Sequence, residues 1–304
     1  MISFETKFRV YLFFLIPSIF CSLFDLYHFL FNKTSRQSLH NHVIIVLLCI
    51  GLICQVTNYP WMLYYYQYGD TWERSWIFCT IWGFLDWPMY LIQTILFAWT
   101  TIERHILIFH DRLVSTKVKR LIFHYLPLSL LLLYCLTFYI ILYFFPPCGE
   151  NISFNFDMIC IFPCYLTDYR FYMWETIGHQ LLPIFTIVFF SITLFVRVVC
   201  QKRRMHRAIR WRKHRKMTLQ LLSISLLYLV FSFPFVVVTI LYLTGSMYSL
   251  YVVFLPYANF FSYLIILLFP FVCALSLPDL KTKLKRIFCL RVRQINPMLA
   301  GGAE

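Results

Sequence analysis

Residues 94–110 read TILFAWTTIERHILIFH, and a Glu-Arg pair, Glu103 and Arg104, stands inside this largely apolar run. Ionised side chains are costly in an apolar environment unless they are paired or reach water. The run therefore predicts either a helix that meets a water boundary at this pair, or a pair with a task at that boundary. The rest of the sequence bears on both interpretations.

The composition of the 304-residue chain is typical of a membrane protein, with 61% hydrophobic, 20% aromatic and 13% charged residues and a mean hydropathy of +0.71. Soluble domains carry about 25% charged and about 45–50% apolar residues. A net charge of +14 alone would suit a nucleic-acid partner, but such a hydrophobic chain favours a membrane surface. We expect one membrane domain over residues 1–304, a lipid bilayer as its partner and no nucleic acid.

Seven apolar runs are long enough to cross a bilayer, which takes about 20 helical residues. We therefore predict an all-α fold, a bundle of seven transmembrane helices at about 8–31, 43–66, 77–109, 121–145, 172–198, 214–243 and 250–277. Apolar and basic residues alternate in 279–290, which predicts a short amphipathic eighth helix on the membrane surface. The first run lacks a small-residue cleavage site, so we interpret it as an anchor.

Basic residues are concentrated in one set of predicted loops, which holds 23 of the 27 Lys and Arg residues: 32–42, 104–120, 197–216 and 279–304. Basic loops stay on the cytoplasmic side. The pattern predicts a multi-pass plasma-membrane protein with its N-terminus outside. Lys7 and Arg9 favour the opposite orientation, but the loop with ten basic residues outweighs them.

Four cysteines fall on the predicted outer side, at positions 79, 148, 160 and 164. An even number in an oxidising compartment indicates disulfides, with three connectivities open. Asn151-Ile-Ser153 is a glycosylation sequon on the same side, so we expect Asn151 to be glycosylated. The sequon at Asn32 lies on the inner side and should stay unmodified.

Glu103-Arg104-His105, at the inner end of the third predicted helix, resembles the Asp/Glu-Arg-Tyr motif of rhodopsin-like G-protein-coupled receptors. Cys79 lies 25 residues before Arg104, and Trp72 lies seven residues before Cys79, as is common in that family. Four prolines stand near familiar positions of the family's helices: Pro60, Pro183, Pro234 and Pro270. The pattern covers nearly the whole chain and is similar to divergent invertebrate members.

This resemblance implies a receptor that binds an extracellular small-molecule or peptide ligand and activates a heterotrimeric G protein through residues 103–105. On activation, Arg104 would leave Glu103 and contact the G protein. The resemblance also implies a disulfide from Cys79 to the second outer loop. There we favour Cys160 as the partner, and the cysteines at 148 and 164 remain alternatives.

Some family motifs are altered in this chain. Gly51 stands where the family's second helix carries an aspartate, and Ser232 stands where a tryptophan precedes the sixth-helix proline. Residues 269–273 read FPFVC, with neither the Asn nor the Tyr of the family's seventh-helix motif. The alternative is therefore a receptor-like seven-helix protein without G-protein signalling, followed by a transporter.

Asp86 and Arg104 are 18 residues apart, which is five turns of 3.6 residues, or about 27 Å. They therefore share one helical face, with Tyr90 between them. A carboxylate within a membrane helix is a candidate functional group, so we take Asp86 and Tyr90 as ligand-binding candidates. The alternative is that Asp86 meets outer water or pairs with a neighbouring hydroxyl.

Asn259 and Tyr263 are four residues apart in the seventh predicted helix and share a face. With Asp86, they resemble the amine-anchoring site of biogenic-amine receptors, in which a carboxylate holds an ammonium by a charge-assisted hydrogen bond. The alternative is that Asn259 and Tyr263 only pack helices together.

Glu175, Thr176 and His179 lie on one flank of the fifth predicted helix. Opposite Asp86, they would suit a ligand with two cationic ends or a basic peptide. The alternative is that Glu175 is a first-turn carboxylate, which is favourable at a helix N-terminus. Asp25, near the inner end of the first predicted helix, is expected to extend to water.

Catalytic motifs such as His-Glu-x-x-His and Gly-x-Ser-x-Gly are absent, and the histidines are scattered rather than clustered. We therefore expect neither an enzyme nor a cofactor or metal site. A transporter would show repeated halves and broken helices, and neither is evident in the sequence.

Overall fold

The computed structural model describes residues 2–73, 75–146, 165, 168–204, 208–243 and 248–276. All regular elements within these ranges are helices, which confirms the all-α prediction. Six helical stretches in them are long and apolar enough to cross a membrane: Phe4–Phe31, Asn41–Tyr68, Lys117–Phe144, Tyr169–Arg197, Leu219–Leu241 and Val253–Leu275. They indicate a multi-pass membrane protein. The predicted amphipathic segment, 279–290, lies outside the described residues.

The α-helices are α1 (Phe4–Phe31), α2 (Lys33–Arg36), α3 (Leu39–Val56), α4 (Asn58–Tyr68), α5 (Trp76–Phe109), α6 (Lys117–Arg120), α7 (Leu126–Phe144), α8 (Tyr169–Trp174), α9 (Leu182–Arg204), α10 (Ala208–Leu243) and α11 (Tyr248–Ser276). A 3-10 turn, η1 (Asp111–Val114), and two π-helical turns, η2 (Leu121–Tyr125) and η4 (Glu175–Leu181), connect some of them. Three stretches predicted as single helices, 43–66, 121–145 and 172–198, are each divided between two or three of these elements.

A proline closely follows the break in each divided helix. A proline ring conflicts with the carbonyl four residues earlier, and α3 ends at Val56, four residues before Pro60. The turns η2 and η4 each end two residues before a proline, Pro127 and Pro183. A locally widened helix relieves the crowding that the proline ring causes. These irregular turns matter because they carry buried polar side chains.

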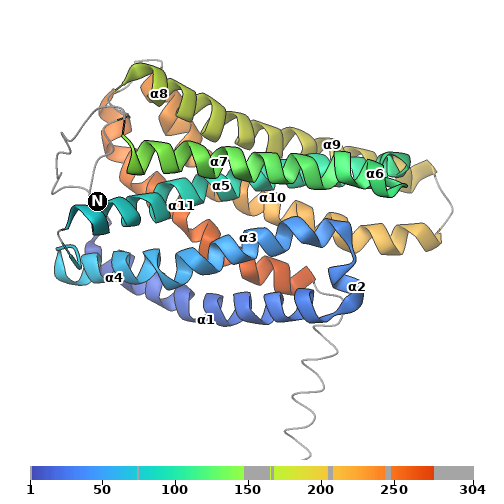
Figure 1. Ribbon diagram of the computed structural model, residues 1–304, viewed down its shortest axis with the longest axis horizontal. Helices are drawn as coiled ribbons and strands as arrows, with labels where there is room; N and C mark the ends of the chain where they lie inside the picture. Colours follow the sequence, from blue (N-terminus) through green and yellow to red (C-terminus); the bar gives the residue numbers. More distant parts are fainter. Residues whose placement is uncertain are drawn as a thin grey trace, which may run out of the picture.

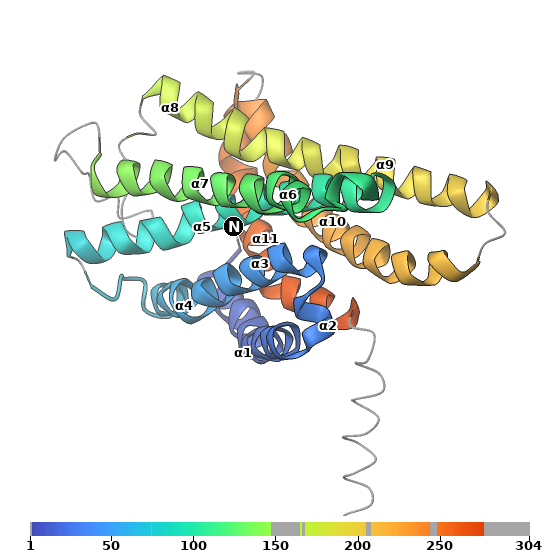
Figure 2. The same ribbon diagram turned by 45° about the vertical axis from the view of Figure 1, so that its right-hand side comes forward.

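The helices lie side by side as one bundle. Figures 1 and 2 show α1 and α4 on one side of the bundle, α8 and α9 on the other, and α5 and α11 between them. Helix α5 packs against α3, α7 and α9, and α11 packs against α1, α3 and α10. The central helix α5 is therefore in contact with both sides of the bundle.

The outward faces of the peripheral helices are apolar. Phe13 on α1 is 72% exposed, Leu133 on α7 is 63% exposed and Phe189 on α9 is 64% exposed. Soluble monomers rarely expose large contiguous apolar patches. A ring of such side chains around a helical bundle fits contact with lipid, in agreement with the composition.

Candidate functional site

Asp86 on α5 joins three helices through its carboxylate. Its Oδ1 accepts a hydrogen bond from the Asn58 side-chain amide (2.8 Å), and its Oδ2 accepts one from the Tyr263 hydroxyl (2.7 Å). A second set of bonds holds these donors: Trp82 Nε1 donates to Asn58 Oδ1 (2.7 Å), and the Tyr59 hydroxyl donates to the Tyr263 carbonyl (2.5 Å). The carboxylate therefore links α4, α5 and α11.

The structure brings Tyr263 to Asp86, as expected, but it supplies the amide from a different helix. Asn259 does not bond Asp86, and its backbone carbonyl accepts the Ser262 hydroxyl (2.9 Å). The bonded amide belongs to Asn58, the first residue of α4. Its position two residues before Pro60, at a helix break, is the sequence signal that could have identified it.

Glu175 lies at the start of η4 and is 1% exposed, so it is not a solvated first-turn carboxylate. Its Oε1 accepts hydrogen bonds from Trp87 Nε1 (2.9 Å), the Tyr165 hydroxyl (3.2 Å) and the Tyr139 hydroxyl (3.4 Å). Its Oε2 is buried and has no hydrogen-bond partner among the described residues. One oxygen is thus saturated with donors while the other remains available.

His179, one turn after Glu175, is held between two tyrosines. Trp174 Nε1 donates to the Tyr134 hydroxyl (3.0 Å), which leaves that hydroxyl proton for His179 Nε2 (2.9 Å). His179 Nδ1 then donates to the Tyr139 hydroxyl (2.9 Å), whose own proton is directed to Glu175. This arrangement corresponds to a neutral imidazole that is protonated at Nδ1.

Aromatic rings connect the two carboxylates. Tyr263, which bonds Asp86, has its ring centroid 6.2 Å from that of Tyr90, and Tyr90 stacks on Trp87 at 5.6 Å. Trp87 in turn donates to Glu175. The predicted residues of helices α5, η4 and α11 are therefore brought together in one cluster.

One predicted member, Thr176, contributes less to this cluster. Thr176 is buried beside Glu175 but takes no part in the hydrogen bonds of the cluster. Neither Asp86 nor Glu175 forms an ion pair with a Lys or Arg among the described residues. The cluster therefore presents two carboxylates, neutral donors and aromatic faces, which are the groups that recognise organic cations.

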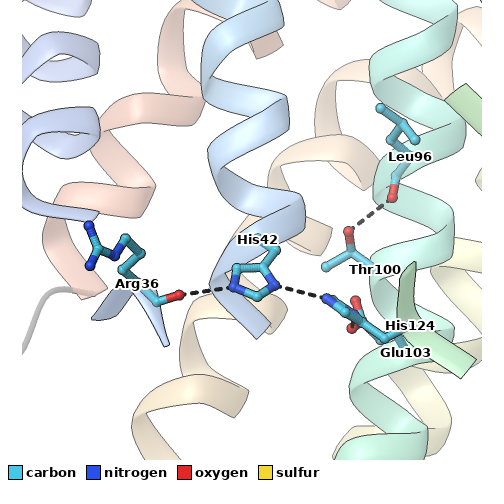
Figure 3. A network of polar contacts seen from close by, with 6 residues as sticks. All are labelled: Arg36, His42, Leu96, Thr100, Glu103 and His124. Atoms are coloured by element: carbon cyan, nitrogen blue, oxygen red, sulfur yellow. Dashed lines mark hydrogen bonds and ion pairs between the residues drawn. The ribbon is translucent and has the colours of Figure 1, made fainter. Parts of the chain in front are cut away.

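A second polar cluster lies at the Glu103 end of α5 (Figure 3). Glu103, 2% exposed, bonds to Nδ1 of His124 on η2. His124 Nε2 contacts His42 Nδ1 (3.0 Å), and His42 Nε2 contacts the Arg36 carbonyl (2.9 Å). The expected Glu103–Arg104 pair thus has an additional member, because the Glu103 carboxylate also bonds a histidine of another element.

The other two residues of the predicted coupling motif have different environments. Arg104 is 1% exposed and interacts electrostatically with Glu103 and with Cys273 of α11. His105 is partly exposed, and its ring contacts Phe109 (4.8 Å) and Phe190 (5.7 Å). Only Arg104 of these two therefore lies in the bundle interior.

Asp25 contradicts the expectation that it extends to water. It is 0% exposed on α1, and both carboxylate oxygens lack a hydrogen-bond partner in the described part of the chain. The Cys273 thiol lies within electrostatic range of this carboxylate. The predicted end of this helix, residue 31, agrees with the end of α1, so the burial of Asp25 comes from the packing of α11 along α1.

Other predicted sites fall largely outside the described residues, namely Asn151 and the cysteines at 148, 160 and 164. Cys79 lies in the first turn of α5, is 1% exposed and is not among the free cysteines of the described part. Among the described residues, no group of three His, Cys, Asp or Glu side chains could hold a metal ion. No family model matches this chain, and no curated protein matches it either.

Proposed function

We propose that this chain is a rhodopsin-like G-protein-coupled receptor of the plasma membrane, with seven spans and its N-terminus outside. It binds an extracellular ligand with two cationic groups, an amine or a basic peptide, and activates a heterotrimeric G protein at the Glu103 end. The observation that carries this proposal is the aromatic cluster that joins Asp86 to Glu175.

Helix α5 serves as the seventh span in this proposal. Its 34 residues extend about 50 Å, which exceeds the hydrocarbon thickness of about 30 Å. Its polar side chains Asp86, Gln93 and Glu103 lower its hydropathy, and they suit a helix that packs against α3, α7 and α9 rather than lipid. The central position of α5 and its polar side chains therefore both support its role as a seventh span that is shielded from lipid.

The charge of the cluster supports a cationic ligand. Asp86 and Glu175 accept N–H and O–H donors but no Lys or Arg among the described residues, so no cationic side chain there would compensate a negative charge on either. Burying a charge without an ionic partner is unfavourable. A ligand ammonium at Glu175 Oε2 would supply the missing donor, and the rings of Trp87 and Tyr90 would add cation–π contacts.

The test is a G-protein activation assay in cells that express the full chain, screened with monoamines, diamines and basic peptides. We expect Glu175→Gln and Asp86→Asn each to reduce ligand potency about 10- to 100-fold, because a hydrogen bond to a charged group contributes about 1.5–3 kcal/mol. Glu5→Gln is the matched control, since Glu5 is an exposed carboxylate bonded to Arg9. Unchanged potency in both variants would contradict the cationic-ligand proposal.

A receptor-like protein without signalling is the second candidate, and one observation favours it. Glu103 bonds His124, so its carboxylate is not held by Arg104 alone, and breaking the contact with Arg104 would not by itself free it. The same assay decides between the two, because a protein that reaches the cell surface and shows neither basal nor ligand-dependent activation of any G protein would be this second kind.

A further inference from the structure

Helix α7 and the turn η4 are joined by side chains rather than by close packing of their backbones. Helices α7, α8 and α9 lie together on one side of the bundle (Figures 1 and 2). Among the described elements, α7 packs closely on α5 but not on η4 or α9. Five aromatic side chains fill the space between α7 and η4, and we call them the α7–η4 seam: Tyr134, Phe138, Tyr139, Trp174 and His179.

The outer members of the seam face lipid. Tyr134 is 41% exposed and Trp174 is 56% exposed. Their exposed neighbours, Leu133 on α7 and Ile177 on η4, are apolar. Tyr134 stands ten residues before Phe144, the last residue of α7, which is about 15 Å along a span of about 42 Å. At this depth the seam meets the acyl chains of the bilayer rather than water.

One hydrogen bond closes the seam on its lipid side. Trp174 Nε1 donates to the Tyr134 hydroxyl (3.0 Å). The bilayer core holds no water, so each of these polar groups needs a partner in the protein, and they supply each other. The Trp174 ring rests on Gly178, where an added Cβ would stand 3.8 Å from the ring, so this residue places no side chain beneath it. The ring therefore has room to move when the bond opens.

Behind this bond, polar atoms continue inward to an acceptor without a partner. The Tyr134 hydroxyl donates to His179 Nε2 (2.9 Å), and His179 Nδ1 donates to the Tyr139 hydroxyl (2.9 Å). That hydroxyl donates to Glu175 Oε1 (3.4 Å). The second oxygen of Glu175, Oε2, is buried and has no hydrogen-bond partner among the described residues. A molecule that followed this route from the lipid would meet aromatic faces, which attract cations, and then a carboxylate.

Two requirements define what can use this route. The molecule must dissolve in the bilayer, because the seam opens among acyl chains, and it must carry a positively charged donor, because the route ends at a carboxylate. We infer that the ligand is an amphiphilic amine that enters from the bilayer through the α7–η4 seam. Its head displaces the bond between Trp174 and Tyr134 and binds Glu175 Oε2, while its alkyl chain stays against Leu133 and Ile177.

This inference rests on the proposed function, which makes Glu175 a ligand site, and it adds the class of the ligand and its route. A head with two amino groups also serves Asp86, because the rings of Trp87 and Tyr90 connect the two carboxylates. The probe for the test is therefore a propanediamine that carries one long alkyl chain with a photoreactive diazirine.

The test uses the full chain in nanodiscs, with mass spectrometry to locate the residues that the illuminated probe labels. We expect more label at Leu133 and Ile177 than at Phe13 of α1, which is 72% exposed and reports simple partition into lipid. At sub-saturating probe, Glu175→Gln should reduce this excess about 10- to 100-fold, because the head loses a bond to a charged group. Glu5→Gln, at an exposed carboxylate, should leave the excess unchanged.

Trp174→Phe provides a second measurement if Glu175→Gln does not fold. It keeps an aromatic ring and removes the N–H, so the seam opens more often, and the excess label should build up about 2- to 10-fold faster. Trp76→Phe, at the exposed first residue of α5, should leave this rate unchanged.

The outcomes separate the route from the proposed function. Label no stronger in the seam than at Phe13, or an excess that neither Glu175→Gln nor Trp174→Phe changes, would overturn the route. G-protein activation by the propanediamine without its chain, in a protein whose seam shows no excess label, would overturn the route and leave the proposed function standing. Excess label in the seam of a protein that activates no G protein would support the route and reject the proposed function.

Discussion

Asp25→Asn tests whether the buried carboxylate of α1 weakens the fold. Asp25 is 0% exposed, and neither oxygen has a hydrogen-bond partner among the described residues. A charged side chain at the centre of a membrane helix costs about 2.5–3.5 kcal/mol. Protonating an aspartate at pH 7, from an ordinary pKa of about 3.9, costs about 4 kcal/mol. The folded protein bears the smaller of these costs, about 3 kcal/mol.

The substitution recovers only part of this free energy. Asparagine has the same shape without the charge, but its amide also lacks partners at this position, at a cost of about 1–3 kcal/mol. We therefore expect Asp25→Asn to raise the free energy of unfolding by up to about 2 kcal/mol. At about 2–4 °C per kcal/mol, the unfolding midpoint should rise by up to about 8 °C.

Thermal unfolding of the purified protein at pH 7, in one fixed detergent and lipid mixture, measures this change. Glu5→Gln is the control, because Glu5 is an exposed carboxylate on the same helix and its removal should change stability by less than about 0.5 kcal/mol. A lowered midpoint for Asp25→Asn would refute the reasoning, since it would mean that the carboxylate holds a stabilising cation.

Two further substitutions test the packing of α5, with the same measurement. In Gly83→Ala the added Cβ would lie 2.8 Å from Cε1 of Tyr143, so we expect the free energy of unfolding to fall by about 1–3 kcal/mol. Gly178→Ala should be tolerated, because no atom would lie nearer than 3.8 Å to its added Cβ. Asn58→Ala removes the hydrogen bonds at both ends of the side-chain amide and should lower the free energy of unfolding by about 2–4 kcal/mol. Asn259→Ala should lower the same quantity by less than about 1 kcal/mol. Equal effects within either pair would contradict the described contacts.

The positions of the apolar helices could be predicted from the sequence because a run of about 20 apolar residues indicates a membrane-spanning helix. The divisions within them could not be predicted from hydropathy. The run 43–66 is apolar on both sides of Thr57, and the break there depends on how the chain accommodates Pro60. A proline alone does not predict such a break, because several prolines lie inside undivided helices, namely Pro17, Pro88, Pro234, Pro256 and Pro270.

The candidate site was predictable where one helix determines the geometry and not where several helices meet. Asp86 and Glu175 could be named as candidate ligand-binding carboxylates because each stands out in an apolar run, although contact with outer water remained the alternative for both. Their donors Asn58, Tyr139 and Tyr165 come from other segments, so only tertiary packing brings them together. The same reason explains why His124 was missed as the partner of Glu103.

The two clusters hold α5 near both of its ends through donors that can be exchanged. Near the first, Asp86 is held by the neutral donors Asn58 and Tyr263, so an arriving cation would offer a stronger, charge-assisted bond and release α11 from α5. Near the second, Glu103 is held by His124, which in turn contacts His42. A cation at Asp86 would thus act on the helix that also carries Glu103, and any coupling between the two clusters must be reciprocal.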